Sequence, residues 1–379
     1  MSLPNLYVRV NGTNNGPGFV AFTSNVVSFN ITSGRQALLD TYGATTADVT
    51  IRLTSGNSAD LALVKVGLGV VLAQSATDYA TTARRSYMKV SDVRYEYSVA
   101  PNSDYVVLSL EGNLAAANRS QLDNFNLAAN DIVSQLSTVS SNVPGTYTWV
   151  NSSIENPLMD GTTITSVADW LQTVVTTVNG RVRDIAASGT ASILSKYYYA
   201  AWTDLISTKT FVLTDGTLTV GAGELPIAYD VFDYSSLGQN YFTAAIVDPL
   251  NHAAQTAGTD KTRVLTLSTL NYNTAQAQDY ANYLVNLYDD PQLRPQTLSI
   301  NGQVSNADTI FHTMGSMVGC SFPVIFRGVR TTVVIEGFSY TADPGASRWT
   351  LSVSGADLNN YLILDDASRG VLDSNRLGY

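Results

Sequence analysis

The chain has 379 residues, of which 45% are hydrophobic and only 14% are charged, and its formal net charge is −10. This acidic balance excludes tight binding to duplex nucleic acid, because such affinity comes mainly from Lys and Arg residues that neutralise phosphates. A single cysteine and two histidines exclude an internal disulfide framework and a multi-cysteine zinc site.

Length and surface composition indicate a folded chain that meets other proteins. About two or three domains fit within the length, each with its own core. Ser, Thr, Asn, Gln and Tyr supply most of the polar surface, a composition that large protein interfaces favour.

The start of the chain predicts neither export nor membrane insertion. No basic segment followed by an apolar one opens the sequence, so we expect no secretory signal and synthesis in the cytoplasm. The longest apolar stretch, 61–74, contains Lys65 and is shorter than the roughly 20 residues that span a bilayer. We therefore expect no membrane anchor.

Residues 1–118 are predicted to form a β-rich domain. The segment 28–57 contains two strands separated by a polar loop that carries Arg35, and its second strand, 49–55, alternates apolar and polar residues. The segment 92–112 has two such runs around a Pro-Asn-Ser-Asp turn, which predicts a β-hairpin.

Residues 119–264 are predicted to form a mixed α+β middle region. Apolar spacing predicts helices over 119–142 and 169–182, the second capped by Ser166 or Asp169. The segment 210–221 predicts a hairpin around Asp215-Gly216, a dipeptide that tolerates positive φ.

Residues 265–379 are predicted to form a helix and a second β-rich domain. An apolar and aromatic stripe predicts a helix over 273–289, which ends before Pro291. A strand over 294–302 and a short helix over 306–318 follow. The segment 331–357 predicts a hairpin turning at 342–345, and its similarity to the earlier hairpin suggests two related β-barrels around the middle insert.

No residue pattern predicts catalysis, a metal or a cofactor. No Gly-x-Ser-x-Gly elbow surrounds a serine, and His252 and His312 lie in no recognisable motif. Neighbouring acids such as Asp289-Asp290 and Asp365-Asp366 point in different directions and make no chelate alone. Cys320 lies among apolar residues, which predicts a buried and inert thiol.

An aromatic group in the middle region has two interpretations. One is a sugar-stacking platform, and the more ordinary one is packing on a neighbouring element or subunit. The group consists of Tyr197, Tyr198, Tyr199 and Trp202.

Several segments in order resemble the tail hub and minor tail proteins of long-tailed bacteriophages, the gp27-like baseplate hub family. The segments 28–57 and 91–119 resemble their strand, Ser-Gly-Arg loop and hairpin, and 275–300 resembles their helix-proline-strand element. The segments 333–357 and 361–379 resemble their closing hairpin and C-terminal tail. The middle region matches weakly, and the order of the segments carries the resemblance.

The resemblance implies a non-enzymatic structural protein of the virion, located at the distal tip of the tail. Three chains with two tube-like barrels each would form a ring that adapts a sixfold tail tube to threefold tip proteins and lines the DNA channel. Its implied partners are further copies of the chain, the distal tail or tail-tube protein, the tape measure protein and a tip or fibre protein, with genomic DNA only in transit. No cofactor is implied.

The interface residues expected in that ring lie in the loop around Arg35 and in the segment from 362 to the C-terminus. The apolar and arginine side chains of this second segment are expected to lie on a neighbouring copy: Leu362, Leu364, Leu372, Arg376, Leu377 and Tyr379. The alternative function is a receptor- or carbohydrate-binding tail module that uses the aromatic group above. A hydrolase of cell-wall polymers is a third hypothesis.

Overall fold

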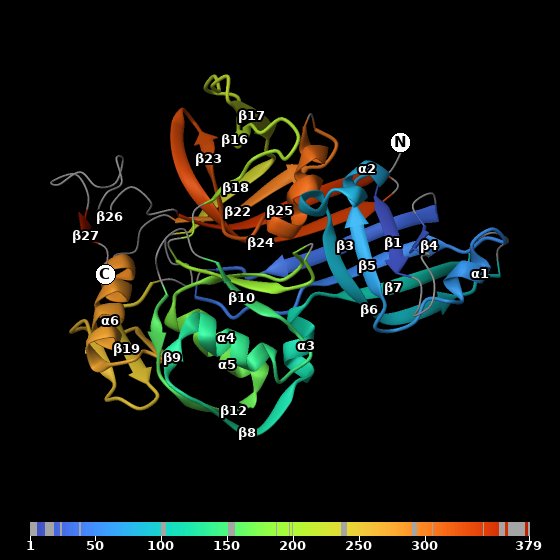
Figure 1. Ribbon diagram of the computed structural model, residues 1–379. Helices are drawn as coiled ribbons and strands as arrows, with labels where there is room; N and C mark the ends of the chain where they lie inside the picture. Colours follow the sequence, from blue (N-terminus) through green and yellow to red (C-terminus); the bar gives the residue numbers. More distant parts are fainter. Residues whose placement is uncertain are drawn as a thin grey trace.

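The structure is a computed structural model, and it describes residues 6–11, 19–22, 25–37, 39–99, 104–150, 156–186, 188–196, 198, 200–235, 241–289, 294–304, 306–343, 345–355, 361–362 and 376–377. One hydrophobic core runs through most of the fold, and a second, smaller core lies around the helix at 274–288. Figure 1 shows the N-terminal strands, the C-terminal strands and a helical middle region around that larger core.

A single curled sheet of 15 strands dominates the fold. Its path runs in the order β17-β16-β23-β24-β3-β4-β7-β6-β5-β1-β2, with β15, β18, β22 and β25 attached beside it. The strands are β1 (Tyr7–Asn11), β2 (Phe19–Ala21), β3 (Val26–Gly34), β4 (Thr46–Arg52), β5 (Gly69–Ala73), β6 (Ser86–Glu96), β7 (Tyr105–Glu111), β15 (Ala200–Ala201), β16 (Thr210–Thr214), β17 (Glu224–Ala228), β18 (Val231–Ser235), β22 (Arg294–Asn301), β23 (Cys320–Phe326), β24 (Val329–Asp343) and β25 (Ala346–Gly355).

The sheet has two curved halves, which we call the N-terminal lobe (β1–β7) and the C-terminal lobe (β15–β18 and β22–β25) (Figure 1). Inward-facing side chains alternate along the strands, as in β3, where Phe29, Ile31 and Ser33 are buried and the residues between them are more exposed. One face of each half therefore covers its own part of the core. The curled sheet and the α+β middle region confirm the prediction of a β-rich α+β chain with two barrel-like parts around a mixed insert.

Short helices close the ends of the two lobes and the middle region. Near the N-terminal lobe lie α1 (Ser58–Leu61), α2 (Ala76–Ala80), η2 (Thr82–Arg84) and α3 (Leu114–Arg119). The 3-10 helix η3 (Ala307–Ser316) belongs to the C-terminal lobe and buries Phe311 and Met314. Phe311 packs against Phe29 of β3, with 6.4 Å between ring centroids, so both lobes share this part of the core.

The middle region packs α4 (Ile132–Ser140) and α5 (Val167–Thr177) beside three small sheets (Figure 1). Ser166 accepts a hydrogen bond from the backbone N–H of Asp169 and caps α5, whose buried face includes Trp170 and Val174. The sheets pair β8 (Gln121–Leu127) with β12 (Thr162–Ser166), β9 (Asn130–Asp131) with β11 (Leu158–Met159), and β10 (Tyr147–Val150) with β14 (Ala191–Leu194) and β13 (Arg181–Arg183).

Residues 241–289 form a small unit with its own core, which we call the α6 unit. Helix α6 (Thr274–Tyr288) begins at Asn273, whose side chain accepts from the N–H of Gln276, and packs across the strands β19 (Ala244–Pro249), β20 (Gln255–Ala257) and β21 (Val264–Thr269). At the end of the chain, β26 (Tyr361–Leu362) pairs with β27 (Arg376–Leu377) in parallel. No helix among the described residues is both long and apolar enough to cross a membrane.

Most predicted elements are confirmed by the structure. The strand-loop-strand around Arg35, both hairpins, the helix ending before Pro291 and the strand after it all form at the expected places. The short helix predicted over 306–318 is present as the 3-10 helix η3.

One predicted element does not form and two predicted helices are shorter than expected, each because of a contact distant in sequence or a local turn. The helix over 119–142 is a strand, β8, in its first half, because these residues pair with β12 and Asn124 takes a positive φ of 48°. The helix over 169–182 ends at Thr177, because Asn179 at φ 46° leads directly into β13. The hairpin over 210–221 does not form, since β16 pairs with β17 in parallel.

Candidate functional site

The two lobes are joined by one strand, β24, which pairs with β23, β25 and β3 along its 15 residues. Its pairing with β3 runs from Gly337 opposite Gly34 to Ala342 opposite Phe29. The register of β24 against β25 shifts between Ile335 and Gly337. Glu336 therefore lies at a β-bulge, where a side chain is turned away from the regular alternation.

The bulge requires glycine on both strands. A Cβ on Gly34, whose φ is +86°, would lie 2.4 Å from the backbone oxygen of Glu336. A Cβ on Gly337 would lie 2.5 Å from the backbone oxygen of Arg35. The close approach of the two backbones brings Glu336 beside Arg35, whose N–H donates to the Glu336 carbonyl over 3.1 Å.

A buried ion cluster of three charged residues fills this junction. The carboxylate of Glu336, fully buried, accepts from Nε of Arg35 at 3.0 Å and from Nε and Nη2 of Arg181 at 2.9 and 2.7 Å. The hydroxyl of Ser354 donates to the same carboxylate over 2.5 Å. Arg35 follows β3, Arg181 begins β13 and Glu336 lies in β24, so one cluster joins the two lobes and the middle region.

The cluster keeps Glu336 ionised. Burial by itself raises the pKa of this carboxyl, but the charges of Arg181 and Arg35 and the hydrogen bonds from Arg181 and Ser354 outweigh it and lower the pKa from 4.5 to about 2. A buried carboxylate with two guanidinium partners is thus a fixed structural anion, without the raised pKa that a general acid needs.

Arg35 is committed inside the chain. Only 7% of the surface of Arg35 is exposed. Its guanidinium donates from Nη2 to the carbonyl of Gly180 at 3.1 Å and lies 4.6 Å from the ring centre of Tyr42. Burial and the ion pair therefore commit the Arg35 side chain to contacts within the chain, and the interface role of the loop around Arg35 stays a prediction. The loop residues 36, 37 and 39–41 after it remain at least partly exposed.

Strand β13 and the residue that follows it, Asp184, form hydrogen bonds with both lobes. Arg183 donates from Nε to the carbonyl of Val318 in the C-terminal lobe over 2.8 Å. The buried carboxylate of Asp184 accepts from the backbone N–H groups of Thr45 at 2.6 Å and Leu114 at 2.5 Å, next to strands β4 and β7. Burial raises the pKa of Asp184, and these N–H donors partly counter the rise.

The sequence contains one indication of this junction, a charged residue within an apolar run, which an analysis of periodicity does not detect. Glu336 interrupts the apolar run Val-Val-Ile-Glu-Gly-Phe. Arg181 begins the short strand β13 of the middle region, and Asp184 directly follows that strand. A charge within an apolar run predicts a buried ion pair, but the identity of its partner requires the fold. The predicted site residues did not include Glu336, Arg181 or Asp184.

The predicted aromatic group does not form a platform as a whole. Trp202 is 1% exposed, donates from Nε1 to the hydroxyl of Thr313 at 2.9 Å, and packs against Phe211 with 4.6 Å between centroids. Trp202 is therefore a core residue and cannot stack on a sugar in this structure. Tyr198 is partly buried beneath the guanidinium of Arg183, 5.0 Å away, while Tyr197 and Tyr199 lie outside the described residues.

The predicted C-terminal interface is described only in part. Leu362 lies in β26 and Arg376 and Leu377 lie in β27, and these strands pair with each other. Leu364, Leu372 and Tyr379 lie outside the described residues. The interface role of this segment remains a prediction.

The histidines and the cysteine occupy separate places. Nδ1 of His312 lies 3.3 Å from Asp78, and burial lowers the pKa of this histidine, while Asp78 and Asp204 counter the fall in part. Nε2 of His252, on the α6 unit, lies 3.4 Å from the Asp160 carboxylate of the middle region. Cys320 is buried, as predicted, and burial raises the pKa of its thiol. Across the described ranges, no three His, Cys, Asp or Glu side chains gather as a metal site would require.

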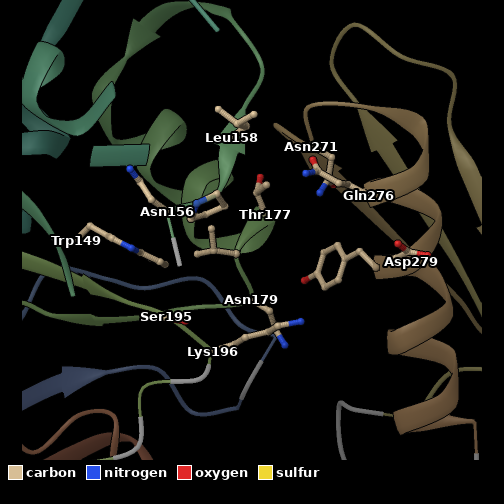
Figure 2. A pocket seen from close by; sticks show the side chains of 13 residues that line it. Trp149, Asn156, Leu158, Thr177, Asn179, Ser195, Lys196, Asn271, Gln276 and Asp279 are labelled. Carbon is tan, nitrogen blue, oxygen red and sulfur yellow. The ribbon is translucent and has the colours of Figure 1, made fainter. Parts of the chain in front are cut away.

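A cleft of about 370 Å³ lies between the middle region and the α6 unit. Figure 2 shows Trp149, Asn156 and Leu158 on the side of the middle region and Gln276 and Asp279 on helix α6. This cleft was not predictable from sequence patterns, because its walls come from segments at 149–196 and 271–280 that only the fold brings together. The complete lining is Trp149, Asn156, Pro157, Leu158, Thr177, Val178, Asn179, Ser195, Lys196, Asn271, Gln276, Asp279 and Tyr280.

Large apolar side chains are exposed at the α1 end of the N-terminal lobe, and we call them the N-lobe patch. Tyr97 is 75% exposed and stacks on Tyr95 with 6.2 Å between centroids, and the Tyr95 hydroxyl donates to the carbonyl of Leu61 in α1. Grouped exposed apolar side chains of this kind are typical of surfaces that contact another protein. The patch consists of Leu63, Val66, Tyr95, Tyr97 and Val99.

The fold is that of solved bacteriophage tail proteins. The chain is similar to a tail protein from Neisseria meningitidis MC58, with a TM-score of 0.60 and 12% identity, covering 93% of this chain and 97% of the other. It is also similar to the 43 kDa tail protein of prophage MuSo2 from Shewanella oneidensis, with a TM-score of 0.57, 11% identity and coverage of 92% and 97%.

A third similar structure comes from a secretion system. It is an Escherichia coli component of the type VI secretion system, described as structurally similar to the T4 bacteriophage tail proteins gp27 and gp5, with a TM-score of 0.51, 10% identity and coverage of 93% and 77%. No protein-family model and no curated protein sequence matches the chain. The likeness therefore lies in the fold and is not carried by sequence identity.

Proposed function

We propose that this chain is a structural protein of a phage virion that forms the hub at the distal tip of the tail. The observation that carries the proposal is the extent of the fold match, which covers 93% of this chain and 97% of a solved tail protein. A match over nearly both whole chains supports a shared architecture and not only a shared module. The charged residues of the junction support a structural role, because each is committed to a contact within the chain.

The proposed hub is a ring of three copies. Two curved lobes per chain would give six similar positions around one axis, which allows a threefold ring to dock onto a sixfold tail tube. Strand β24 fixes the angle between the lobes through its pairing with β3, and the ion cluster of Glu336, Arg35 and Arg181 holds that angle from inside. A rigid angle is what a closed ring needs, since a variable one would give open chains.

Two surfaces are proposed to contact the neighbouring copy. The N-lobe patch offers exposed aromatic and aliphatic side chains, which release water when they are covered. The C-terminal segment from 362 onward is proposed to lie on the neighbour, as its apolar and arginine residues suggest. The division of the chain at residues 118 and 264 is likewise part of the proposal.

The proposed ring sits between other tail proteins and surrounds the path of the genome. We propose a distal tail or tail-tube protein above it, the tape measure protein within reach of its channel, and a tip or fibre protein below it. The net charge of −10 suits a channel that DNA must cross without binding, because carboxylates repel phosphates. Changing the carboxylates that line the channel to Lys should slow ejection, and unchanged ejection would contradict this part of the proposal.

A location experiment tests the function separately from the oligomeric state. Antibody raised against the purified chain and coupled to gold is applied to particles of the phage that encodes it, and the grains are placed by electron microscopy. The proposal expects label at one end of the tail, distal to the capsid. Label along the tail shaft, on the capsid or only on unassembled protein would refute it.

A further inference from the structure

The cleft between the middle region and the α6 unit has the form of a ligand site. Its volume of about 370 Å³ lies within the range of small-molecule sites, and such sites occur preferentially where two packed units meet. The two walls here belong to the two separate hydrophobic cores. A ligand in this position would contact both units at once.

Two buried polar side chains in the wall have an oxygen without a protein partner. Tyr280 and Asn271 both line the cleft, and each is 7% exposed. The hydroxyl of Tyr280 and the amide oxygen Oδ1 of Asn271 have no hydrogen-bond partner within the described parts of the chain. Because a buried polar atom without a hydrogen bond destabilises the fold, each of these two oxygens is available to a further partner.

The other groups at the cleft narrow the class of ligand. Asn156, Gln276 and Asn179 carry side-chain amides, which donate and accept hydrogen bonds. The Thr177 hydroxyl already donates to the Thr173 carbonyl and accepts from the N–H of Leu270. The formal charges of Lys196 and Asp279 cancel, so the cleft does not select an anion such as a phosphate or a nucleic acid. Trp149 is partly exposed, and its indole contributes apolar atoms to one wall of the cleft.

We infer that this cleft binds an uncharged carbohydrate. A sugar hydroxyl both donates and accepts hydrogen bonds, so it can satisfy the Tyr280 hydroxyl or the Asn271 amide oxygen, and the C–H face of a sugar ring packs on an aromatic ring. In this arrangement Trp149 contacts the face of the ring, Asp279 and Asn156 accept from and donate to its outer hydroxyls, and Tyr280 and Asn271 bind the group that enters deepest. The site differs from the aromatic group around Trp202, which is buried.

The cleft also lies close to the junction of the lobes. Asn179 and Ser195 line it, and the next residue after Asn179, Gly180, accepts from the guanidinium of Arg35. A sugar bound to Asn179 would therefore contact the residue next to Gly180, whose carbonyl is hydrogen-bonded to the ion cluster between the lobes.

The test measures binding by the full chain to a printed array of oligosaccharides from lipopolysaccharide O-antigens, capsules and peptidoglycan, followed by calorimetric titration of each glycan retained. Tyr280→Phe removes only the unpartnered hydroxyl, so it should raise the unfolding midpoint of the ligand-free chain while weakening the retained glycan about tenfold, the value of one hydrogen bond. Tyr272→Phe on the same unit is the matched control, because Tyr272 is 41% exposed and is outside the lining, and it should bind as the parent does.

Asp279→Asn is a second variant, and it leaves the packing of the core unchanged because Asp279 is exposed. It should weaken the same glycan several-fold without affecting stability. An array with no retained glycan, a glycan whose affinity neither variant changes, or retention only of charged glycans would overturn the inference. Ring assembly is recorded on the same samples, so that loss of the cleft proposal and loss of the hub proposal are told apart.

Discussion

Replacing Glu336 by glutamine tests the ion cluster that joins the two lobes. The substitution keeps the shape of the side chain but leaves Arg35 and Arg181 buried without the carboxylate that they share. Breaking a buried ion pair by removal of one partner typically costs about 3–5 kcal/mol. We expect Glu336→Gln to lower the free energy of unfolding by an amount in that range at neutral pH.

The pKa of Glu336 gives an independent magnitude for the same contact. Its folded-state pKa of about 2 lies below the ordinary 4.5, so the folded state favours the ionised carboxyl. The stabilisation is therefore present above pH 4.5 and is lost as the pH falls from about 4.5 towards 2. At 1.36 kcal/mol per pH unit this difference corresponds to ~3 kcal/mol, which agrees with the cost of breaking the pair.

Urea unfolding followed by tryptophan fluorescence at several pH values between 7 and 3 measures both effects. The parent chain should lose stability steeply below pH 4.5, and the Glu336→Gln variant should start lower and lack that part of the slope. Glu224→Gln is the matched control, since Glu224 pairs with Arg330 at the surface and such pairs contribute at most about 1 kcal/mol. If Glu336→Gln destabilises no more than Glu224→Gln, the cluster does not hold the lobes together.

Three further predictions concern the glycine bulge, the histidine and the cysteine. Gly34→Ala should destabilise the chain by several kcal/mol because its Cβ meets the backbone of β24, whereas Gly216→Ala, at φ +84° with open space around it, should cost only about 1 kcal/mol of backbone strain in the same urea titration. Because burial lowers the pKa of His312 in the folded state, stability should fall as the pH drops below the ordinary value of 6.5, and urea midpoints at about pH 7 and 5.5 should show a decrease that His312→Asn removes. Cys320 should react with a thiol reagent only after unfolding, so rapid labelling of the native chain would contradict its burial.

Elements whose contacts are local were predictable from the sequence. Helix α6 has its own cap at Asn273 and its own apolar stripe. The predicted helix, 273–289, and the observed one, Thr274–Tyr288, therefore differ by one residue at each end. The hairpin of β24 and β25 likewise alternates along both strands and turns where the sequence places Asp343 and Gly345.

Elements decided by distant partners were not predictable. Leu122 and Phe125 have helical spacing, but they form a strand because β12, some 40 residues later, pairs with them. Asp215 and Gly216 do form a turn, yet the Asp215 carboxylate accepts from the N–H of Arg327 in the turn after β23, so the chain does not return as a hairpin.

The site shows the same limit more strongly. Glu336 and Arg35 are 301 residues apart and Glu336 and Arg181 are 155 residues apart, so the ion cluster exists only once both lobes and the middle region have folded. Trp202 was a reasonable surface candidate beside three tyrosines, but its neighbours Phe211 and Thr313 come from other segments and bury it. The order of the segments along the chain indicates the architecture, whereas only the folded structure shows that Glu336 pairs with Arg35 and Arg181.

Electron microscopy of the purified full chain, with class averages viewed along the particle axis, shows whether the proposed hub forms. We expect a closed ring of three copies with six similar lobes around an open centre, and we expect Tyr97→Glu in the N-lobe patch to disrupt it. A chain that remains a monomer at every concentration reached, or that forms particles with another symmetry, would contradict the hub proposal.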